Sequence, residues 1–376
     1  MWRRVARVVA MGEPVRLPVH PPRRPGDGGR PGRGASGNPR NRFERLSFAW
    51  QAEQAGEAGP APATSFFRDA SRSILSWNDS PDVNFDVGVN PYRGCEHGCI
   101  YCYARPFHEY LGFSAGLDFE SKILVKEDAP ELLRQALMAP RWQPRVIALS
   151  GVTDPYQPVE ARLGITRRCL EVAAEFRNPV AIITKSHLVT RDVDLLGEMA
   201  RYDAAVVNVS ITTLDRTLQR VMEPRAATPE RRLDAIRAFA AAGVPVRVMA
   251  APIIPGLTDH ELPAIVAAAA QAGAVDASTI VVRLPHGVKD LFTTWLDERF
   301  PDQKEKVLNR IRAMHGGALY DPDFATRHNG QGPLAEQIRG LFRAAMKKAG
   351  LPARHIQLST DAFRRPTPPG GQLGLF

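Results

Sequence analysis

Three cysteines lie within eight residues of one another, in the segment NPYRGCEHGCIYCYARPF. Cys95, Cys99 and Cys102 have the spacing Cys-x3-Cys-x2-Cys, and Tyr101 stands directly before the last of them. Thiolates are ligands that iron–sulfur clusters and zinc prefer. Three thiolates on one tight loop can hold three corners of a 4Fe-4S cluster, which leaves the fourth iron free to bind a substrate.

A structural zinc ion is the alternative, with His97 or His108 as its fourth ligand. Structural zinc sites are usually built from paired Cys-x2-Cys or Cys-x2-His units that come from two places in the chain. The sequence has no second pair, so the spacing favours the cluster. The fourth cysteine, Cys169, lies among apolar residues at helical spacing, and we expect a buried core thiol there.

Four cysteines in 376 residues do not make a disulfide framework, and their crowding indicates a metal site in a reducing compartment. No apolar run has the roughly 20 residues of a membrane helix, so we expect a cytoplasmic protein. Residues 1–10 are Arg-rich and lack the apolar region of a secretory signal, although a mitochondrial presequence starts in a similar way. Met11 is an alternative start.

The elements that would position the cysteines alternate between short apolar runs and amphipathic stretches. The runs are rich in Val, Ile and Ala without polar alternation, which is typical of parallel strands buried on both faces. Repeated strand–helix units predict a parallel α/β architecture. Six strands are too few for a closed eight-stranded barrel, so a partial barrel and a doubly wound sheet both fit. The predicted strands are residues 86–90, 146–150, 180–184, 205–211, 244–251 and 279–283.

Two helices have readable ends. Thr228 precedes Pro229 at the start of one helix, and Gly243 follows its end. Thr258 and Glu261 have the spacing of a capping box that opens a helix over residues 262–272.

Charge and composition divide the chain into parts. Residues 1–50 contain eleven arginines and three acids, a net charge of +8 that leaves only +1 for residues 51–376. We expect a disordered leader over residues 1–65, a barrel over 66–285, a helical C-terminal extension over 286–365 and a flexible tail over 366–376. The alternative for the Arg-rich leader is an arm that contacts nucleic acid weakly.

The cysteine motif after a first predicted strand resembles the signature of the radical S-adenosylmethionine (SAM) superfamily. The segments GVNPYRGCEHGCIYCYARPFHEYLG and APIIPGLTD are similar, more narrowly, to the spore photoproduct lyase-related branch, many of whose members have no assigned reaction. The resemblance spans residues 85–285. It implies a partial (β/α)6 TIM-like barrel, in agreement with the six predicted strands.

The resemblance also implies the cofactors, a 4Fe-4S cluster and SAM. In the family, the amino and carboxylate groups of SAM chelate the unique iron, and an added electron breaks the C–S bond. The resulting 5′-deoxyadenosyl radical abstracts hydrogen from a substrate, which is unknown for this chain. No flavin or nicotinamide fingerprint is present, so the electron would come from an external donor of the flavodoxin or ferredoxin type.

The family's SAM contacts come from the carboxyl ends of strands. After the second strand, Gly151, Thr153 and Asp154 correspond to a motif that meets the SAM ammonium, although the same residues fit an ordinary turn. After the third strand, Lys185 would pair with the SAM carboxylate, and its alternative is an exposed surface lysine. Tyr101 of the cysteine motif is the remaining expected contact in this group.

Further expected contacts follow the fourth and fifth strands. Ser210 and Thr212 would offer hydroxyls to the ribose or the carboxylate. Ile254 would pack on the adenine, and Gly256 would let the chain turn past it. Two charged groups, Glu223 and Arg225, would lie near SAM or else form a surface ion pair.

One departure from the branch limits the expected reaction. The repair lyase of this branch carries a hydrogen-donating cysteine at the end of its second strand, whereas residues 148–151 here are Ala-Leu-Ser-Gly. This difference argues against the same repair chemistry. Two alternatives to a radical SAM enzyme of unknown substrate are a nucleic-acid repair or modification enzyme of the same superfamily and a non-catalytic iron–sulfur protein.

Overall fold

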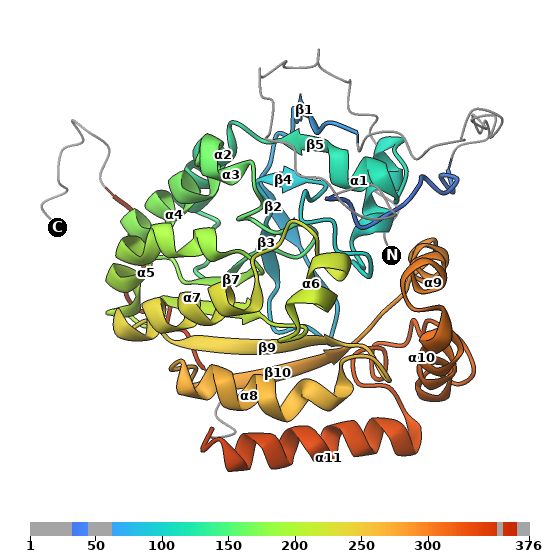
Figure 1. Ribbon diagram of the computed structural model, residues 1–376. Coiled ribbons are helices and arrows are strands. Elements are labelled where there is room, and N and C mark those ends of the chain that lie inside the picture. The colour runs from blue at the N-terminus through green and yellow to red at the C-terminus, as the bar shows by residue number, and fades with distance from the viewer. Residues whose placement is uncertain (1–31, 44–61, 352–355, 367–376) are drawn as a thin grey trace, which may run out of the picture.

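The computed structural model describes residues 32–43, 62–351 and 356–366. A seven-stranded sheet in the order β10-β9-β8-β7-β6-β3-β2 forms its centre (Figure 1). All neighbouring strands are parallel except β2 and β3. The strands are β2 (Leu75–Trp77), β3 (Val87–Val89), β6 (Ile147–Leu149), β7 (Val180–Thr184), β8 (Ala205–Ser210), β9 (Val246–Ile253) and β10 (Asp276–Val281).

The six parallel strands are those expected from the sequence, and each follows its predecessor in spatial order. Such an order requires every connection to cross in the same sense, so the helices cover one side of a curved sheet. This is the partial barrel, and it excludes the doubly wound sheet. The connecting helices are α2 (Ala129–Met138), α3 (Glu160–Leu163), α4 (Ile165–Phe176), α5 (Val193–Ala200), α6 (Arg216–Met222), α7 (Pro229–Ala241) and α8 (Leu262–Gln271), with 3-10 turns η3 (His187–Asp192) and η4 (Asp259–Glu261).

A second, three-stranded sheet encloses the cysteine segment and was not predicted. Its order is β1 (Ser65–Arg68), β5 (Lys122–Val125), β4 (Tyr92–Arg93). Between β4 and β5 lie the cysteines, the 3-10 helix η2 (Arg105–Leu111) and the short helix α1 (Leu117–Ser121). Antiparallel pairing of β4 with β5 therefore holds the two ends of this segment together.

One of the two predicted helix starts is confirmed. The Thr228 hydroxyl accepts a hydrogen bond from the Arg231 amide at the start of α7, and Gly243 follows the helix with φ +74°. The capping box is wrong, because Thr258 accepts from the Ile254 amide instead. Glu261 accepts from the Thr213 hydroxyl and joins η4 to the end of β8. Cys169 is fully buried in the core, as expected.

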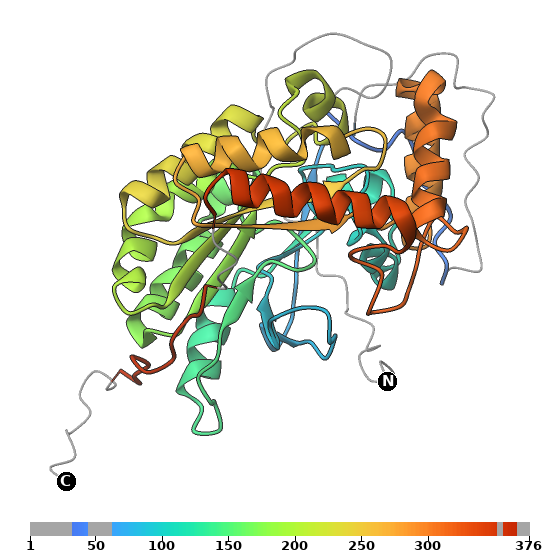
Figure 2. The same ribbon diagram turned by 90° about the horizontal axis from the view of Figure 1, so that it is seen from below.

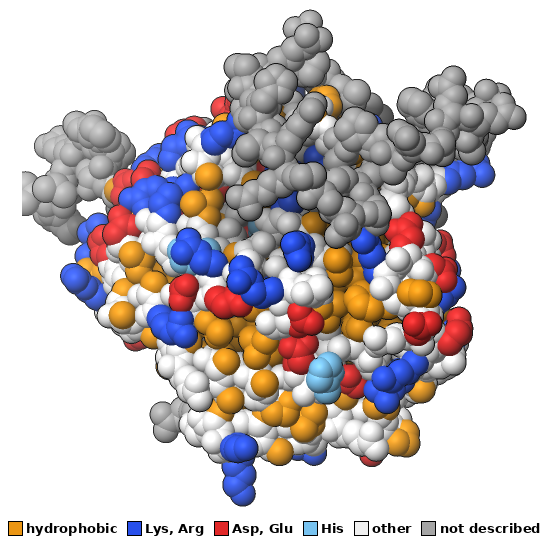
Figure 3. Space-filling view, in the orientation of Figure 1, with side chains coloured by type: hydrophobic (Ala, Val, Ile, Leu, Met, Phe, Trp, Pro, Cys, Tyr) orange, Lys and Arg blue, Asp and Glu red, His pale blue; other side chains and the backbone are white. Residues whose placement is uncertain are grey.

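The leader prediction is wrong for residues 32–43, which lie on the folded body beside the cysteine segment. Burial of Ala35 and Asn41, which are 1% and 8% exposed, accounts for this order. Residues 1–31 and 44–61 lie outside the described residues, so the predicted nucleic-acid contact of the leader remains a prediction. On the face shown in Figure 3, acidic and basic side chains of the described residues are interspersed.

Three helices follow β10: α9 (Val288–Arg299), α10 (Pro301–Met314) and α11 (Gly332–Lys348). Helix α11 lies along α8 on the outside of the sheet, and Ala335, Ile338 and Ala345 join the main core (Figure 2). Helix α9 contributes to a second apolar cluster that includes Cys99 and Tyr101. The predicted boundaries of this C-terminal part remain predictions. Among the described helices, none combines the length and apolarity needed to cross a bilayer.

Candidate active site at the cysteine loop

The three motif cysteines lie at the carboxyl end of β3, on the edge of the sheet where parallel α/β proteins bind ligands. Cys95 and Cys99 are 7% and 8% exposed, Cys102 is half-buried, and all three are free thiols. The loop is tightly wound, because the Cys102 amide donates to the Cys99 carbonyl at 3.2 Å. Gly98 has φ +67°, a conformation that favours glycine at this turn.

Burial raises the pKa of each of the three thiols. Neighbouring groups act in both directions: Asp154 raises the pKa of Cys95, whereas Arg105 and Lys185 lower that of Cys102. Without metal, the thiols are therefore protonated at neutral pH, and iron must displace those protons when it binds. A buried thiolate needs a positive partner, and the irons of a cluster would supply it once the protons have left. The three free thiols of this loop therefore fit a cluster.

Arg105 holds the backbone of the cysteine loop in place. Its fully buried guanidinium donates to the carbonyls of Gly98 and Cys99, at 3.2 and 3.0 Å, and to the Glu120 carboxylate at 2.6 Å. Further bonds reach the carbonyls of Ala115 and Gly116. Since these bonds fix carbonyls on both sides of Cys99, Arg105 determines where that sulfur lies.

Residues 32–43 of the leader pack against the same Arg105–Glu120 pair. The Gly34 and Ala35 amides donate to the two oxygens of Glu120, at 2.9 and 2.8 Å. The Gly34 backbone lies so close to the loop that an added Cβ would be 1.8 Å from the Gly98 carbonyl oxygen. Only glycine fits at residue 34 without a shift of this segment.

A buried polar group lies on the opposite side of the loop. The Tyr101 hydroxyl donates to the Glu223 carboxylate, which also pairs with Arg232 and accepts from the Thr212 hydroxyl at 2.8 Å. Burial alone would raise the pKa of Glu223, but Arg232 and Lys185 lower it to about 2. Glu223 is therefore a buried carboxylate and not half of a surface ion pair, which corrects one of the two expectations for it.

Lys185 points its ammonium group toward this region. The Nζ atom lies 5.9 Å from the centre of the Tyr101 ring and 3.5 Å from the Ala251 carbonyl. No carboxylate among the described residues pairs with it, so the ammonium can bind an anion. Ser210, at the end of β8, is 4% exposed, and its carbonyl is held by Arg232 at 3.0 Å. Lys185, Thr212 and Tyr101 thus lie together, and Arg232 links Ser210 to Glu223 in the same region. The contacts of these residues with SAM remain predictions.

The turn after β6 packs on the cysteine loop. The Tyr103 hydroxyl donates to the Gly151 carbonyl at 2.6 Å, and Val152 packs against the small apolar cluster of Cys95, Ala104 and Phe119. Gly151 has φ +118°, and the Thr153 hydroxyl donates to the Tyr92 carbonyl at 3.4 Å. The predicted ammonium-binding turn is therefore adjacent to the cysteine loop.

Asp154 joins the cysteine loop to β7. One of its oxygens lies 3.3 Å from His97 Nδ1 and accepts from the Lys185 amide at 2.7 Å, and the other accepts from the Thr184 hydroxyl at 2.7 Å. These partners lower its pKa against the opposing effect of burial. Because both oxygens are engaged, the structure gives Asp154 a positioning role, and its contact with the SAM ammonium remains a prediction.

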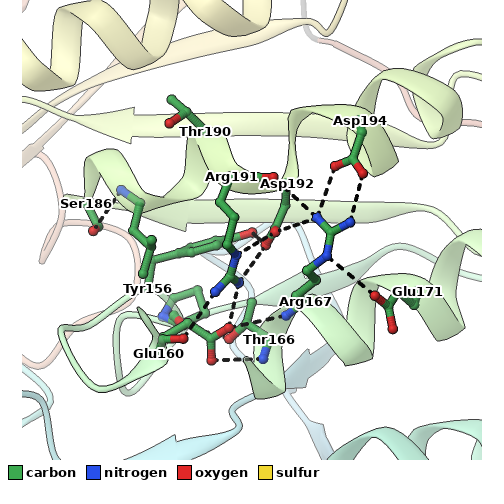
Figure 4. Close-up of polar contacts among 12 residues, drawn as sticks. Tyr156, Glu160, Thr166, Arg167, Glu171, Ser186, Thr190, Arg191, Asp192 and Asp194 are labelled. Atoms are coloured by element: carbon green, nitrogen blue, oxygen red, sulfur yellow. Dashed lines mark hydrogen bonds and ion pairs between the residues drawn. The ribbon is translucent and has the colours of Figure 1, made fainter. Parts of the chain in front are cut away.

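A network of ion pairs supports this turn from behind (Figure 4). Tyr156 donates to Asp192 at 3.0 Å, and Arg191 links Asp192 to Glu160. Glu160 in turn accepts from the hydroxyl of Tyr92, next to the cysteine loop. The two acidic and two phenolic groups of this network are all fully buried, so the network fixes the Asp154 segment rigidly.

The two residues predicted to contact the adenine lie in different surroundings. Ile254 is fully buried in the second apolar cluster, which also contains Cys99 and Tyr101, and its contact with the adenine remains a prediction. Gly256 faces Arg310 of α10, whose Cδ would lie 3.0 Å from an added Cβ. It lines a surface hollow of about 780 Å³ that contains His260 and Phe300 and no cysteine. The structure therefore does not bring Gly256 to the cysteine loop.

The zinc alternative lacks a geometric basis. Across residues 32–43, 62–351 and 356–366, no three His, Cys, Asp or Glu side chains converge as a single metal ion requires. His97 is engaged by Asp154, and His108 packs against the rings of Phe113 and Phe119. A cluster sets its thiolates at separate irons, so it does not need such convergence.

A sequence profile of the Radical SAM superfamily matches residues 89–269, the span from the cysteine loop to the end of α8. An uncharacterized protein of Mycobacterium tuberculosis is 36% identical over 240 residues, which cover 63% of this chain and 69% of that protein. The chain belongs to the radical SAM superfamily. An uncharacterized protein of Methanocaldococcus jannaschii is 31% identical over 173 residues, 46% of this chain and 62% of that protein.

Solved structures agree on the fold of this radical SAM protein. Spore photoproduct lyase complexed with dinucleoside spore photoproduct has a TM-score of 0.53 and 15% identity, covering 75% of this chain and 79% of the lyase. Such low identity shows the partial barrel alone. The family implies a 4Fe-4S cluster and SAM, and the burial and chemistry of the three thiols fit that cluster.

Several site residues escaped the sequence analysis. Arg105 and Glu120 are 15 residues apart in the chain, and nothing local marks them as partners. Arg225 was expected near SAM or in a surface pair, and it instead pairs with the buried Glu96 at 3.0 Å. Arg232 had a readable signal, because it occupies the same buried stripe of α7 as Ile236 and Phe239. A charged residue on such a stripe indicates a buried partner.

Proposed function

We propose that this protein is an enzyme that cleaves SAM reductively and uses the resulting radical on a substrate that is not identified. The observation that carries the proposal is the arrangement of two buried thiols and one half-buried thiol near the Lys185 ammonium, which pairs with no carboxylate among the described residues. When bound and reduced, a 4Fe-4S cluster supplies the electron that breaks the C–S bond of SAM and yields a 5′-deoxyadenosyl radical.

The protein's own residues would position the reactants and exclude water from them. Cys95, Cys99 and Cys102 would bind three irons, with Arg105 fixing the loop that carries them. Lys185 would bind the SAM carboxylate, since its ammonium has no carboxylate partner of its own among the described residues. The buried Glu223 would hold the Tyr101 ring against the loop by accepting its hydroxyl hydrogen.

The reaction needs an electron from outside, and we propose a flavodoxin- or ferredoxin-type donor. The SAM-cleavage proposal is tested by anaerobic reconstitution with iron and sulfide, reduction with dithionite in the presence of SAM, and chromatography for 5′-deoxyadenosine. Formation of 5′-deoxyadenosine that is lost in Cys99→Ala supports the proposal. An assembled cluster that neither binds nor cleaves SAM would instead indicate a non-catalytic iron–sulfur protein.

A further inference from the structure

Arg283 lies at the mouth of the sheet, two residues beyond the end of β10. Its guanidinium lies over the ring of Tyr103, 5.5 Å from the ring centre. Tyr103 directly follows Cys102 and donates its hydroxyl hydrogen to Gly151. Arg283 therefore borders the cysteine loop through Tyr103, just after the edge strand β10.

The guanidinium of Arg283 is only partly satisfied. Its Nη1 donates to His328 Nε2 at 2.9 Å, whereas its Nε is buried and has no hydrogen-bond partner among the described residues. No ion pair within the described residues includes Arg283. The other arginines that approach the site are paired with carboxylates, Arg105 with Glu120 and Arg232 with Glu223.

The acid nearest to this group is already engaged. Asp82 accepts two hydrogen bonds from Arg327, one of them from Nη2 at 2.6 Å, and it lies 3.4 Å from His328 Nδ1. His328 thus donates toward Asp82 and accepts from Arg283, which requires a neutral ring. Burial and the Arg283 charge both lower the pKa of His328, in agreement with that state. Within the described part of the chain, Arg283 therefore has no carboxylate partner.

His315 is a second unsatisfied group in this region. It follows α10, is 5% exposed, and both of its ring nitrogens are buried without a partner among the described residues. Burial lowers the pKa of His315, Asp321 opposes this effect, and the charge of Arg283 adds to the lowering. Buried donors without partners cost free energy unless a ligand or water satisfies them.

We propose that Arg283 forms a subsite for an anionic group of the substrate, a carboxylate or a phosphate. The inference rests on the proposed function, because it assigns a chemical class to the substrate of the proposed SAM-cleaving site. The Nε and Nη2 atoms lie on one edge of a guanidinium, and this edge is the one that binds an oxyanion with two parallel hydrogen bonds. His328, held by Asp82, occupies Nη1 and so orients that edge.

The experiment uses cluster-reconstituted protein saturated with SAM and measures binding of inorganic phosphate and of acetate by calorimetry. We expect one of the two anions to bind, and the preferred one identifies the class. Arg283→Gln should weaken that binding by about tenfold or more. The matched control is Arg237→Gln, which removes an exposed arginine on α7 and should leave anion binding unchanged.

SAM affinity and 5′-deoxyadenosine formation are measured on the same samples. Both should stay within about twofold in Arg283→Gln, because Arg283 binds substrate and not SAM. A comparable loss of SAM affinity would show that Arg283 holds the SAM carboxylate and would overturn the proposal. Anion binding without SAM cleavage in the wild type would instead count against the proposed function alone.

A second measurement needs no variant. Phenylglyoxal modifies accessible guanidinium groups, and peptide mapping reports the modification of Arg283 in the wild-type holoprotein. The preferred anion should protect Arg283 and leave Arg237 unprotected. Wild-type protein that binds neither anion, or an Arg283 modified equally fast with and without anion, would refute the subsite.

Discussion

The guanidinium of Arg105 and the carboxylate of Glu120 form a fully buried ion pair, 2.6 Å apart, directly beneath the cysteine loop. The same carboxylate accepts the amides of Gly34 and Ala35 from the N-terminal segment. One ion pair therefore joins three parts of the chain: the leader, the loop that carries the thiols and α1. Its loss should affect both the stability of the protein and its capacity to bind iron.

Glu120→Gln should destabilise the protein by about 3–5 kcal/mol, because it leaves Arg105 charged and unpaired in the interior. Cluster content after reconstitution should fall with it, since Arg105 positions the carbonyls around Cys99. Chemical unfolding and iron and sulfide analysis measure the two effects. Glu131→Gln, on the exposed side of α2, is the control. Equal unfolding free energy and equal cluster content in the two variants would refute the role of the Arg105–Glu120 pair.

Gly34→Ala should disturb the cysteine loop, because its Cβ would be 1.8 Å from the Gly98 carbonyl. A strained contact of this kind costs about 1–3 kcal/mol, and we expect less iron to be retained. Gly37→Ala is a close match, because an added Cβ there has no neighbouring atom within 4 Å. Equal iron content in both variants would mean that the N-terminal segment does not support the loop.

Lys185→Met should weaken SAM binding by about tenfold or more, since it removes the ammonium proposed to pair with the SAM carboxylate. The cluster itself should assemble normally, because Lys185 contacts no cysteine carbonyl. Equilibrium binding of SAM to reconstituted protein measures the effect, with the exposed Lys289→Met as control. Unchanged SAM affinity in Lys185→Met would mean that another group of the protein binds the SAM carboxylate.

His108 should make the apoprotein sensitive to mild acid. Burial between Phe113 and Phe119 lowers the pKa of His108 from 6.5 to about 4. The unfolded chain then binds this proton more readily, so stability is full above pH 6.5 and falls as the pH drops toward 4. His108→Phe should remove about 3 kcal/mol of that pH dependence.

Unfolding free energies at several pH values between 7 and 4 measure this effect in wild type and His108→Phe. The variant's curve should be flatter over that window, whatever its absolute stability. Two parallel curves would show that His108 does not titrate differently in the folded protein.

The strands and the cysteine loop could be predicted from the sequence because both leave local patterns in it. Buried parallel strands give continuous apolar runs such as residues 180–184, and three cysteines within eight residues are informative without their surroundings. The Arg105–Glu120 pair was not predictable, because Gly34, Arg105 and Glu120 meet only through the fold. The surroundings of Gly256 could not be predicted for the same reason, since Arg310 of α10 reaches it only through the fold.

The central claim is that three thiolates hold a cluster whose fourth iron is open to SAM. The electron paramagnetic resonance spectrum of the reduced, reconstituted protein tests it most directly, recorded with and without SAM. We predict a reduced cluster whose spectrum changes on SAM addition in wild type and in Cys169→Ala, and no such cluster in Cys99→Ala. A spectrum that SAM leaves unchanged, or a cluster that survives in Cys99→Ala, would contradict the account.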